Sequence, residues 1–321
     1  MKPSDSSLSN PFALFAVDDA SPGRLALGVE YLGSQYRGWQ TQQAGVASIQ
    51  PLVEKALQKI ALQPITVHCA GRTDAGVHAC CQVVHFDTCA ARPTRAWVLG
   101  TNNHLPPDIR IRWSKPVATN FHARHSALAR RYRYFIYNSS VPFAQMHDQL
   151  TWHLKPLDAE KMHLAAQLLV GEKDFSAFRS VRCQSSTAWR HLHFIHVYRR
   201  GQLVVIDIQG NAFLHHMVRN IVGSLMLVGE GERPAEWLTE QLEGKKRATG
   251  GITAPAAGLY MAAVHYPEQF NLPLEPLGPH FMHLLAGELP DYPYPLFLPE
   301  WQRSELTRTQ PKSAVMHKEI N

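Results

Sequence analysis

Residues 70–79 read AGRTDAGVHA and place Arg72 two positions before Asp74 in a bend flanked by glycines. An aspartate in a turn commonly accepts hydrogen bonds from neighbouring backbone N–H groups, so a structural role is one interpretation. The other is chemical, because a lone carboxylate held by a guanidinium can serve as a nucleophile. No second carboxylate stands beside Asp74 in this stretch, and a paired-carboxylate mechanism is not indicated.

Residues 129–138, ARRYRYFIYN, interleave arginines with aromatic residues. On a strand, alternation divides them into two faces, with Arg131, Arg133, Phe135 and Tyr137 on one and Tyr132, Tyr134 and Ile136 on the other. A nucleic-acid surface needs this combination, since arginine meets phosphate and flat rings stack on bases. An edge strand with arginines that reach solvent and a tyrosine-rich core face explains the pattern equally well.

Residues 31–43, YLGSQYRGWQTQQ, bring Tyr36, Arg37 and Trp39 together with two glycines. Glycines allow a ligand to approach the backbone closely, and tryptophan offers a stacking face. A glycine-rich turn over a buried tryptophan is the structural alternative. Neither the phosphate-binding loop motif nor the dinucleotide motif occurs in the chain.

Residues 211–220, NAFLHHMVRN, carry His215, His216 and Arg219. On a helix these three would lie close to one face, although adjacent histidines share a face poorly. A metal site would need a third ligand and a water, and H-E-x-x-H is absent, so structural or RNA-facing histidines are favoured. A buried arginine needs a carboxylate partner, and Asp74 is the candidate partner of Arg219.

Composition narrows the class of protein. The 321 residues are enough for about two domains, and the net charge of +6 with a pI of 9.1 indicates a nucleic-acid partner. Five cysteines without a C-x-x-C pair argue against disulfides and a zinc knuckle, and they favour the reducing cytoplasm. No stretch approaches the length of a membrane span.

Hydrophobic periodicity predicts two similar halves, each a mostly antiparallel sheet with helices, which makes the fold class α+β. The predicted strands are 24–33, 65–70, 82–88, 108–117, 129–138, a hairpin over 191–210, and 258–266. The predicted helices are 48–60, 94–99, 157–171 (with Asp158 as its cap and Gly171 after its end), 213–229 and 232–244. The predicted divisions are a flexible leader (1–22), an N-terminal domain (23–120), a C-terminal domain (121–266) and a proline-rich extension (267–321).

Several of these motifs together resemble the bacterial tRNA pseudouridine synthase A family. The resemblance rests on AGRTDAGVHA, YLGSQYRGWQ, FHARHSALARRYRYFIYN, DFSAFR and NAFLHHMVRNIVGSL, which occur in the family's order between about residues 24 and 284. It implies two α+β domains whose sheets join across a central basic cleft. It also implies isomerisation of uridine to pseudouridine at positions 38, 39 and 40 of the tRNA anticodon arm.

The resemblance assigns roles to individual residues. It implies that Asp74 is the nucleophile, that Tyr132 stacks on the target base, and that Arg72 and Arg219 are active-site arginines, with Arg219 paired to Asp74. Neither cofactor nor metal is expected, and the enzyme is expected to act as a homodimer whose subunits both contact each tRNA. The further substrate-binding candidates are Tyr36, Arg37, Trp39 and His215.

Other readings of the sequence remain open. The same basic cleft could belong to a tRNA-binding or folding module without catalysis, although such a module has no use for an acid there. A histidine-rich metal hydrolase would require bound metal. The basic run GKKR (244–247) is either a solvated loop or a phosphate contact. The segment LPDYPYPLFLPEW beyond residue 288 could dock as an extended strap.

Overall fold

The computed structural model describes residues 20, 22–181, 183–245, 251–273 and 278–284. Most of the predicted leader, half of the GKKR run and the whole predicted C-terminal strap lie outside these residues. The strands are β1 Gly23–Tyr31, β2 His68–Cys69, β3 His78–Thr88, β4 Ile109–Val117, β5 Ala129–Asn138, β6 Thr151–His153, β7 Gly171–Asp174, β8 Trp189–Arg200, β9 Leu203–Gly210 and β10 Leu259–His265. The helices are α1 Ile49–Ala61, α2 Ala159–Gln167, α3 Met217–Gly229, α4 Trp237–Gly244 and α5 His280–Leu284, with short helical turns at Ala96–Gly100, Ser176–Phe178 and Glu268–Phe270.

One continuous sheet of ten strands runs through the described part of residues 1–280, in the order β4-β1-β3-β10-β5-β9-β8-β7, with β2 on β3 and β6 on β5. Most neighbours are antiparallel, as predicted. The exception at the centre is β10, which pairs in parallel with β3 through Tyr260 and Met261 and antiparallel with β5. This late strand therefore joins the sheet of the N-terminal half to that of the C-terminal half, and the α+β fold with joined sheets is confirmed.

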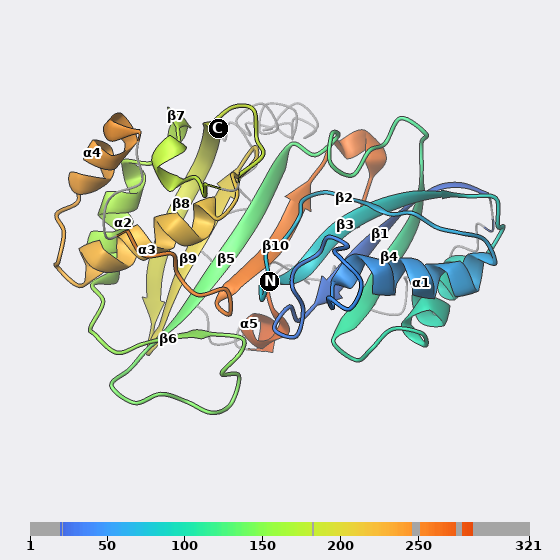
Figure 1. The fold of residues 1–321 in the computed structure, drawn as a ribbon, viewed down its shortest axis with the longest axis horizontal. Helices are drawn as coiled ribbons and strands as arrows, with labels where there is room; N and C mark the ends of the chain where they lie inside the picture. Colours follow the sequence, from blue (N-terminus) through green and yellow to red (C-terminus); the bar gives the residue numbers. More distant parts are fainter. Residues whose placement is uncertain (1–19, 21, 182, 246–250, 274–277, 285–321) are drawn as a thin grey trace, which may run out of the picture. The chain divides into compact units, whose positions relative to one another are not determined.

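The helices α1, α2 and α3 cover one face of the sheet (Figure 1). Alternation along β1 buries Leu25, Leu27 and Val29 on this face, where they join Val53 and Leu57 of α1 in a hydrophobic core. The same core continues beneath α2 and α3. Because the period of two on the strands and the period of 3.6 on the helices meet at one surface, sequence patterning alone predicts which side is covered.

Several element boundaries differ from the predicted ones. The strand expected over 65–70 shrinks to His68–Cys69, which leaves a longer loop before β3. Helix α2 begins at the Asp158 cap as predicted, with the carboxylate accepting from the N–H groups of Glu160 and Lys161, but it ends at Gln167. Gly171 begins β7 and does not cap the helix.

The helix predicted over 213–229 begins at Met217. His216 has a φ of +63°, in the left-handed region, so His215 and His216 form a turn before the helix and not its first helical residues. Periodicity could not reveal this, because apolar residues on both sides of the turn continue the helical pattern.

Two of the three arginines of β5, Arg131 and Arg133, are buried against a carboxylate and do not line the cleft. Arg131 and Arg133 are 5% and 3% exposed, and both donate to the carboxylate of Asp207 on β9, at 2.6 to 3.0 Å. The strand is central, between β10 and β9, and not at an edge. The predicted division into faces is correct, but neither a phosphate-binding role nor an edge-strand role fits these two side chains.

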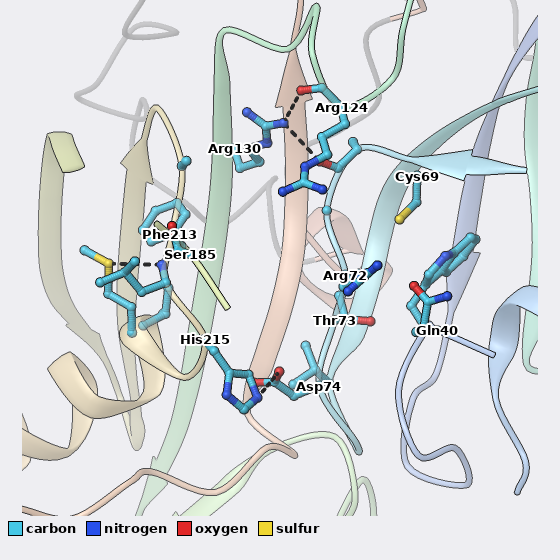
Figure 2. Close-up of a pocket in the computed structure, with 18 of the residues that line it drawn as sticks. Gln40, Cys69, Arg72, Thr73, Asp74, Arg124, Arg130, Ser185, Phe213 and His215 are labelled. Carbon is cyan, nitrogen blue, oxygen red and sulfur yellow. Dashed lines mark hydrogen bonds and ion pairs between the residues drawn. The ribbon is translucent and has the colours of Figure 1, made fainter. Parts of the chain in front are cut away.

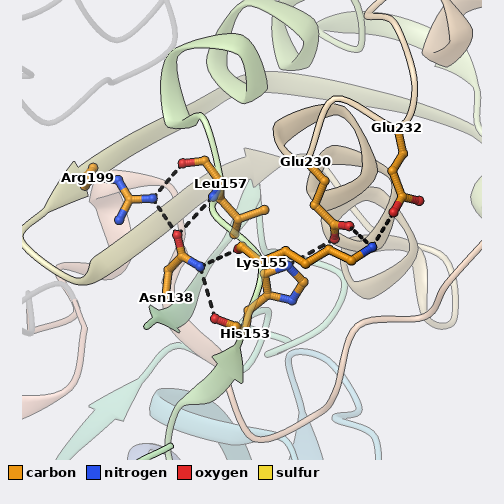
Figure 3. A network of polar contacts seen from close by, with 7 residues as sticks. All are labelled: Asn138, His153, Lys155, Leu157, Arg199, Glu230 and Glu232. Atoms are coloured by element: carbon orange, nitrogen blue, oxygen red, sulfur yellow. Dashed lines mark hydrogen bonds and ion pairs between the residues drawn. The ribbon is translucent and has the colours of Figure 1, made fainter. Parts of the chain in front are cut away.

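At the end of β5, the Asn138 side chain ties several segments together (Figure 3). Its amide nitrogen donates to the carbonyls of His153 and Lys155, at 3.0 and 2.7 Å. Its amide oxygen accepts from the N–H of Leu157 at 3.0 Å and from Arg199 at 2.7 Å. The Asn138 side chain thus holds the segment between β6 and α2 against the end of β5.

Asn138→Ala is expected to lower the free energy of unfolding by about 2–3 kcal/mol, because it removes four hydrogen bonds and leaves their partners unpaired. Urea denaturation followed by circular dichroism measures this change. Asn103→Ala is the matched control, since Asn103 is exposed and its side chain makes no hydrogen bond within the described residues. A loss no larger than that of the control would show that water replaces the Asn138 contacts.

Candidate active site

The loop that carries Asp74 lies between β2 and β3, and residues 31–39 pack against it and hydrogen-bond to it. Thr73 is buried, and its hydroxyl hydrogen-bonds the hydroxyl of Tyr31 at 2.8 Å. The N–H of Trp39 donates to the Thr73 carbonyl at 3.1 Å. Gly38 has a φ of +98°, and a Cβ there would lie 2.6 Å from the same carbonyl oxygen, so only glycine fits. The glycine-rich segment therefore positions the loop.

Three cationic or potentially cationic side chains surround the Asp74 carboxylate, which is 23% exposed. Nε2 of His215 lies 3.2 Å from Oδ1, Nε2 of His216 lies 3.6 Å from Oδ2, and Nη1 of Arg219 lies 3.9 Å from Oδ2. The left-handed turn at His216 brings both histidines to one carboxylate, which a continuous helix would not do. Arg219 is anchored in turn, because its Nε donates to the Ala254 carbonyl at 2.7 Å.

A cleft of about 870 Å³ opens above this carboxylate (Figure 2). Among the described residues that line it, Asp74 is the single carboxylate, and it stands among five arginines, Arg72, Arg124, Arg130, Arg190 and Arg219. Five histidines also line the cleft, namely His68, His122, His125, His215 and His216. A wall with this excess of positive charge attracts a polyanionic ligand and brings it next to Asp74.

Tyr132 reaches the cleft from β5, on the face opposite Arg131 and Arg133. Its ring packs edge-on against Phe213 with the centroids 5.1 Å apart, and the residue is 9% exposed. Burial raises the pKa of the phenol well above its usual value. At neutral pH the side chain is therefore a neutral phenol with a flat ring on the cleft.

Arg130 is a component of the site that the sequence analysis missed. Its guanidinium donates to four carbonyl oxygens, those of Ala70, Arg124, Ala127 and Asn211, at 2.6 to 3.2 Å. It therefore ties the start of the Asp74 loop to the loop after β9. Burial lowers the pKa of this guanidinium. The oxygens of Ala70 and Asn211 lie 60 and 81 positions from Arg130 in the chain, so no local signal could have identified these two contacts.

The remaining candidates fall into two groups. Trp39 lines the cleft although it is only 1% exposed, while Tyr36 and Arg37 do not line it. The Tyr36 hydroxyl donates to Asp108 at 2.8 Å, which holds the ring in the core. Arg72 lines the cleft but points away from Asp74 (Figure 2), and it makes no ion pair within the described part of the chain. The expected guanidinium beside Asp74 is that of Arg219.

The fold and the cleft define a class of protein, an α+β enzyme with a cleft built for a polyanion and a lone carboxylate at its floor. The family model for tRNA pseudouridine synthase matches residues 28–126 and 165–267. The chain belongs to the tRNA pseudouridine synthase family, whose members isomerise uridine to pseudouridine in tRNA. The predicted family is thereby confirmed.

Two curated relatives agree with this assignment. The chain is similar to tRNA pseudouridine synthase A of Pseudomonas aeruginosa, with 54% identity over 278 residues, or 86% of this chain and 96% of the relative. It is also similar to tRNA pseudouridine synthase A of Cronobacter sakazakii, with 56% identity over 81% of this chain and 96% of the relative. A chain of the crystallised Cbf5-Nop10-Gar1 complex matches at 13% identity with a TM-score of 0.29, over 63% of this chain and 44% of that chain.

Among the helices that the structure describes, none is long and apolar enough to cross a membrane.

Proposed function

We propose that this enzyme converts uridine to pseudouridine at positions 38, 39 and 40 of the tRNA anticodon arm, with Asp74 as the nucleophile and without cofactor or metal. One observation carries the proposal. Asp74 is the single carboxylate among the described residues of a cleft lined by five arginines, and a histidine stands within 3.2 Å of it. A protein that only bound RNA would weaken its own affinity by keeping a carboxylate there.

The chemistry needs little more than this acid. Pseudouridine forms when the bond between ribose C1′ and N1 of the base breaks, the base turns, and C5 bonds to C1′. The reaction oxidises nothing and adds nothing. The target uridine first leaves its stack, at a cost of a few kcal/mol. The Asp74 carboxylate then attacks C1′ and displaces N1, or it adds to C6 of the base. The C5 proton passes to a water, or to the Tyr132 oxygen if the phenol releases its own proton in the same step.

Tyr132 is proposed to stack on the flipped uridine. Tyr132→Ala is expected to weaken capture of the target base by ~1–3 kcal/mol, the worth of one base–aromatic stack, and so to slow single-turnover isomerisation by about 5- to 150-fold. Tyr132→Phe keeps the ring and its contact with Phe213 and is expected to bind tRNA as the wild type does. Quench-flow kinetics and filter binding measure the two effects. If Tyr132→Ala and the wild type had the same tRNA affinity and the same rate, Tyr132 would not stack on the target base.

Arg72 and His215 are proposed to bind substrate or the reacting groups from the cleft wall, together with Trp39. Tyr36 and Arg37 are proposed to act on RNA only through the loop that they support or flank. The assembly is proposed to be a cytoplasmic homodimer in which both subunits contact one tRNA. The five free cysteines support a reducing location.

The experiment that tests the function uses unmodified tRNA carrying tritium at C5 of uridine, with chelator present. The wild-type enzyme is expected to release tritium, and tRNA variants with cytidine at positions 38, 39 and 40 are expected to release none. Release from the triple variant would place the target outside these positions. Tight tRNA binding without release from any substrate would leave a binding module and refute the enzyme.

A further inference from the structure

We propose that Asp74, His215 and His216 form a binding site for a divalent transition metal, with Zn²⁺ as the best fit, and that a metal bound there blocks the isomerase. The binding half of the proposal rests on geometry alone. The inhibition half also rests on the proposed role of Asp74 as nucleophile. No metal takes part in the reaction itself.

The three side chains converge on one point. The Nε2 atoms of His215 and His216 lie 3.2 and 3.6 Å from the two carboxylate oxygens of Asp74. The ligand atoms of all three groups lie within 4.8 Å of one another. A tetrahedral zinc ion with ligands at ~2.0–2.1 Å separates them by roughly 3.4 Å. Small rotations of the imidazole rings, whose centroids are 4.0 Å apart, close the remaining gap.

This convergence is specific within the protein. Among the residues that the structure describes, these three form the one group of three or more histidine, cysteine, aspartate or glutamate side chains whose ligand atoms meet in this way. A second group of histidines lies at the cleft, where the rings of His122 and His125 are tilted against each other with centroids 4.3 Å apart, and His122 also contacts His85 at 4.6 Å. Its nitrogens do not converge on one point.

The donor set selects the metal. Two imidazoles and one carboxylate suit Zn²⁺ and its transition-metal neighbours, while Mg²⁺ and Ca²⁺ prefer oxygen ligands. Three protein ligands leave a fourth position, and the cleft lies on that side because all three residues line it. The open position can take a water or a phosphate oxygen of bound RNA.

A metal in this site competes directly with catalysis. A carboxylate oxygen that coordinates Zn²⁺ no longer has its electron pair available for attack on carbon. The ion also displaces the guanidinium of Arg219, which approaches Oδ2 at 3.9 Å. The two histidines that contact the Asp74 carboxylate therefore also allow a metal to bind it, and the bound metal blocks the reaction.

The site is built for reversible binding. Metal-ligating histidines usually donate their second ring N–H to an acceptor, and such partners contribute about 10- to 100-fold in affinity. Nδ1 of His215 is buried and has no hydrogen-bond partner within the described residues. We therefore expect a metal that chelators remove readily, unlike a permanent structural zinc.

Binding is tested with Co²⁺ and Zn²⁺ alone, on the full chain without RNA. Co²⁺ is expected to give the visible absorption of a four-coordinate site, which one equivalent of Zn²⁺ bleaches. His216→Asn is expected to weaken this binding at least about 100-fold, and Asp74→Asn likewise. The matched controls are His125→Asn, at a cleft histidine outside the trio, and Cys183→Ser, at a cysteine whose sulfur accepts from the backbone N–H of His215 at 3.4 Å. Binding unaffected by His216→Asn, or lost equally in a control, overturns the site.

Inhibition is tested by tritium release at increasing free Zn²⁺, with free Mg²⁺ as the comparison ion. Each variant is scored against its own metal-free rate. Zn²⁺ is expected to inhibit the wild type and the two control variants, with full recovery after chelation, while His216→Asn needs at least about 100-fold more metal. A wild type that binds Zn²⁺ at the trio yet keeps its full rate refutes the inhibition. A chain that binds Zn²⁺ there but never releases tritium refutes the proposed function and leaves the metal site standing.

Discussion

Asp74→Asn is expected to lower the single-turnover rate of isomerisation by roughly 10⁴-fold or more, as loss of an essential nucleophile does in other enzymes. Asparagine has the same shape and can still accept hydrogen bonds from His215 and His216, so the loop between β2 and β3 should keep its conformation. tRNA affinity is expected to stay equal or to rise, because the change removes the one carboxylate that the described residues place on a wall of arginines. Tritium release and filter binding measure the two quantities.

The matched control is Asp87→Asn. Asp87 pairs with Arg24 on the neighbouring strand, its side chain is 65% exposed, and it does not line the cleft. Its replacement is expected to leave the rate unchanged. If Asp74→Asn retained more than a hundredth of the wild-type rate, another group would have to attack the sugar or the base.

Arg219→Met is expected to lower the rate by about 10²- to 10³-fold, the usual effect of removing one preorganised charged donor. The Arg219 guanidinium makes two contacts. Its Nη1 lies 3.9 Å from the Asp74 carboxylate, and its Nε donates to the Ala254 carbonyl at 2.7 Å. Arg219→Lys keeps the charge but cannot make both contacts, because an ammonium lacks the planar fork. We therefore expect the lysine variant to recover only part of the loss.

Steady-state kinetics separate this role from simple RNA binding. If Arg219 positions Asp74, kcat falls and KM changes little, because the carboxylate is misplaced in every bound complex. Arg233→Met is the control, as Arg233 lies over the ring of Trp237 and outside the cleft. A rise in KM alone for Arg219→Met would instead make Arg219 a phosphate contact.

Local pattern was sufficient for much of this architecture. Alternation along β5 placed Tyr132 on one face and Arg131 on the other, because a central strand obeys a strict period of two. The need of a buried arginine for a carboxylate led from Arg219 to Asp74, a pair 145 positions apart in the chain, now separated by 3.9 Å. A buried charged side chain needs a partner of opposite charge, so such a pair can be predicted even when its two residues are far apart in the sequence.

The failures share a physical cause. The sequence matches Arg131 and Arg133 with phosphate or solvent because their partner, Asp207, has no local signature in an otherwise apolar strand. Periodicity places His216 on a helix because a left-handed residue that is not glycine leaves no mark in the sequence. Arg130 binds only backbone carbonyls, which every residue possesses. Interactions that depend on a single φ angle or on distant main-chain atoms need the folded backbone.

The central position of β10 also has a consequence for synthesis of the protein on the ribosome. The strand that separates β3 from β5 spans residues 259–265, so it emerges after every other strand of the sheet. Until then, the nascent chain exposes edges of β3 and β5 that invite pairing with other chains. A transcript cut short before codon 259 would encode every strand but the one that joins the two halves. Such a product should be a target for chaperones and proteases, and not a smaller working enzyme.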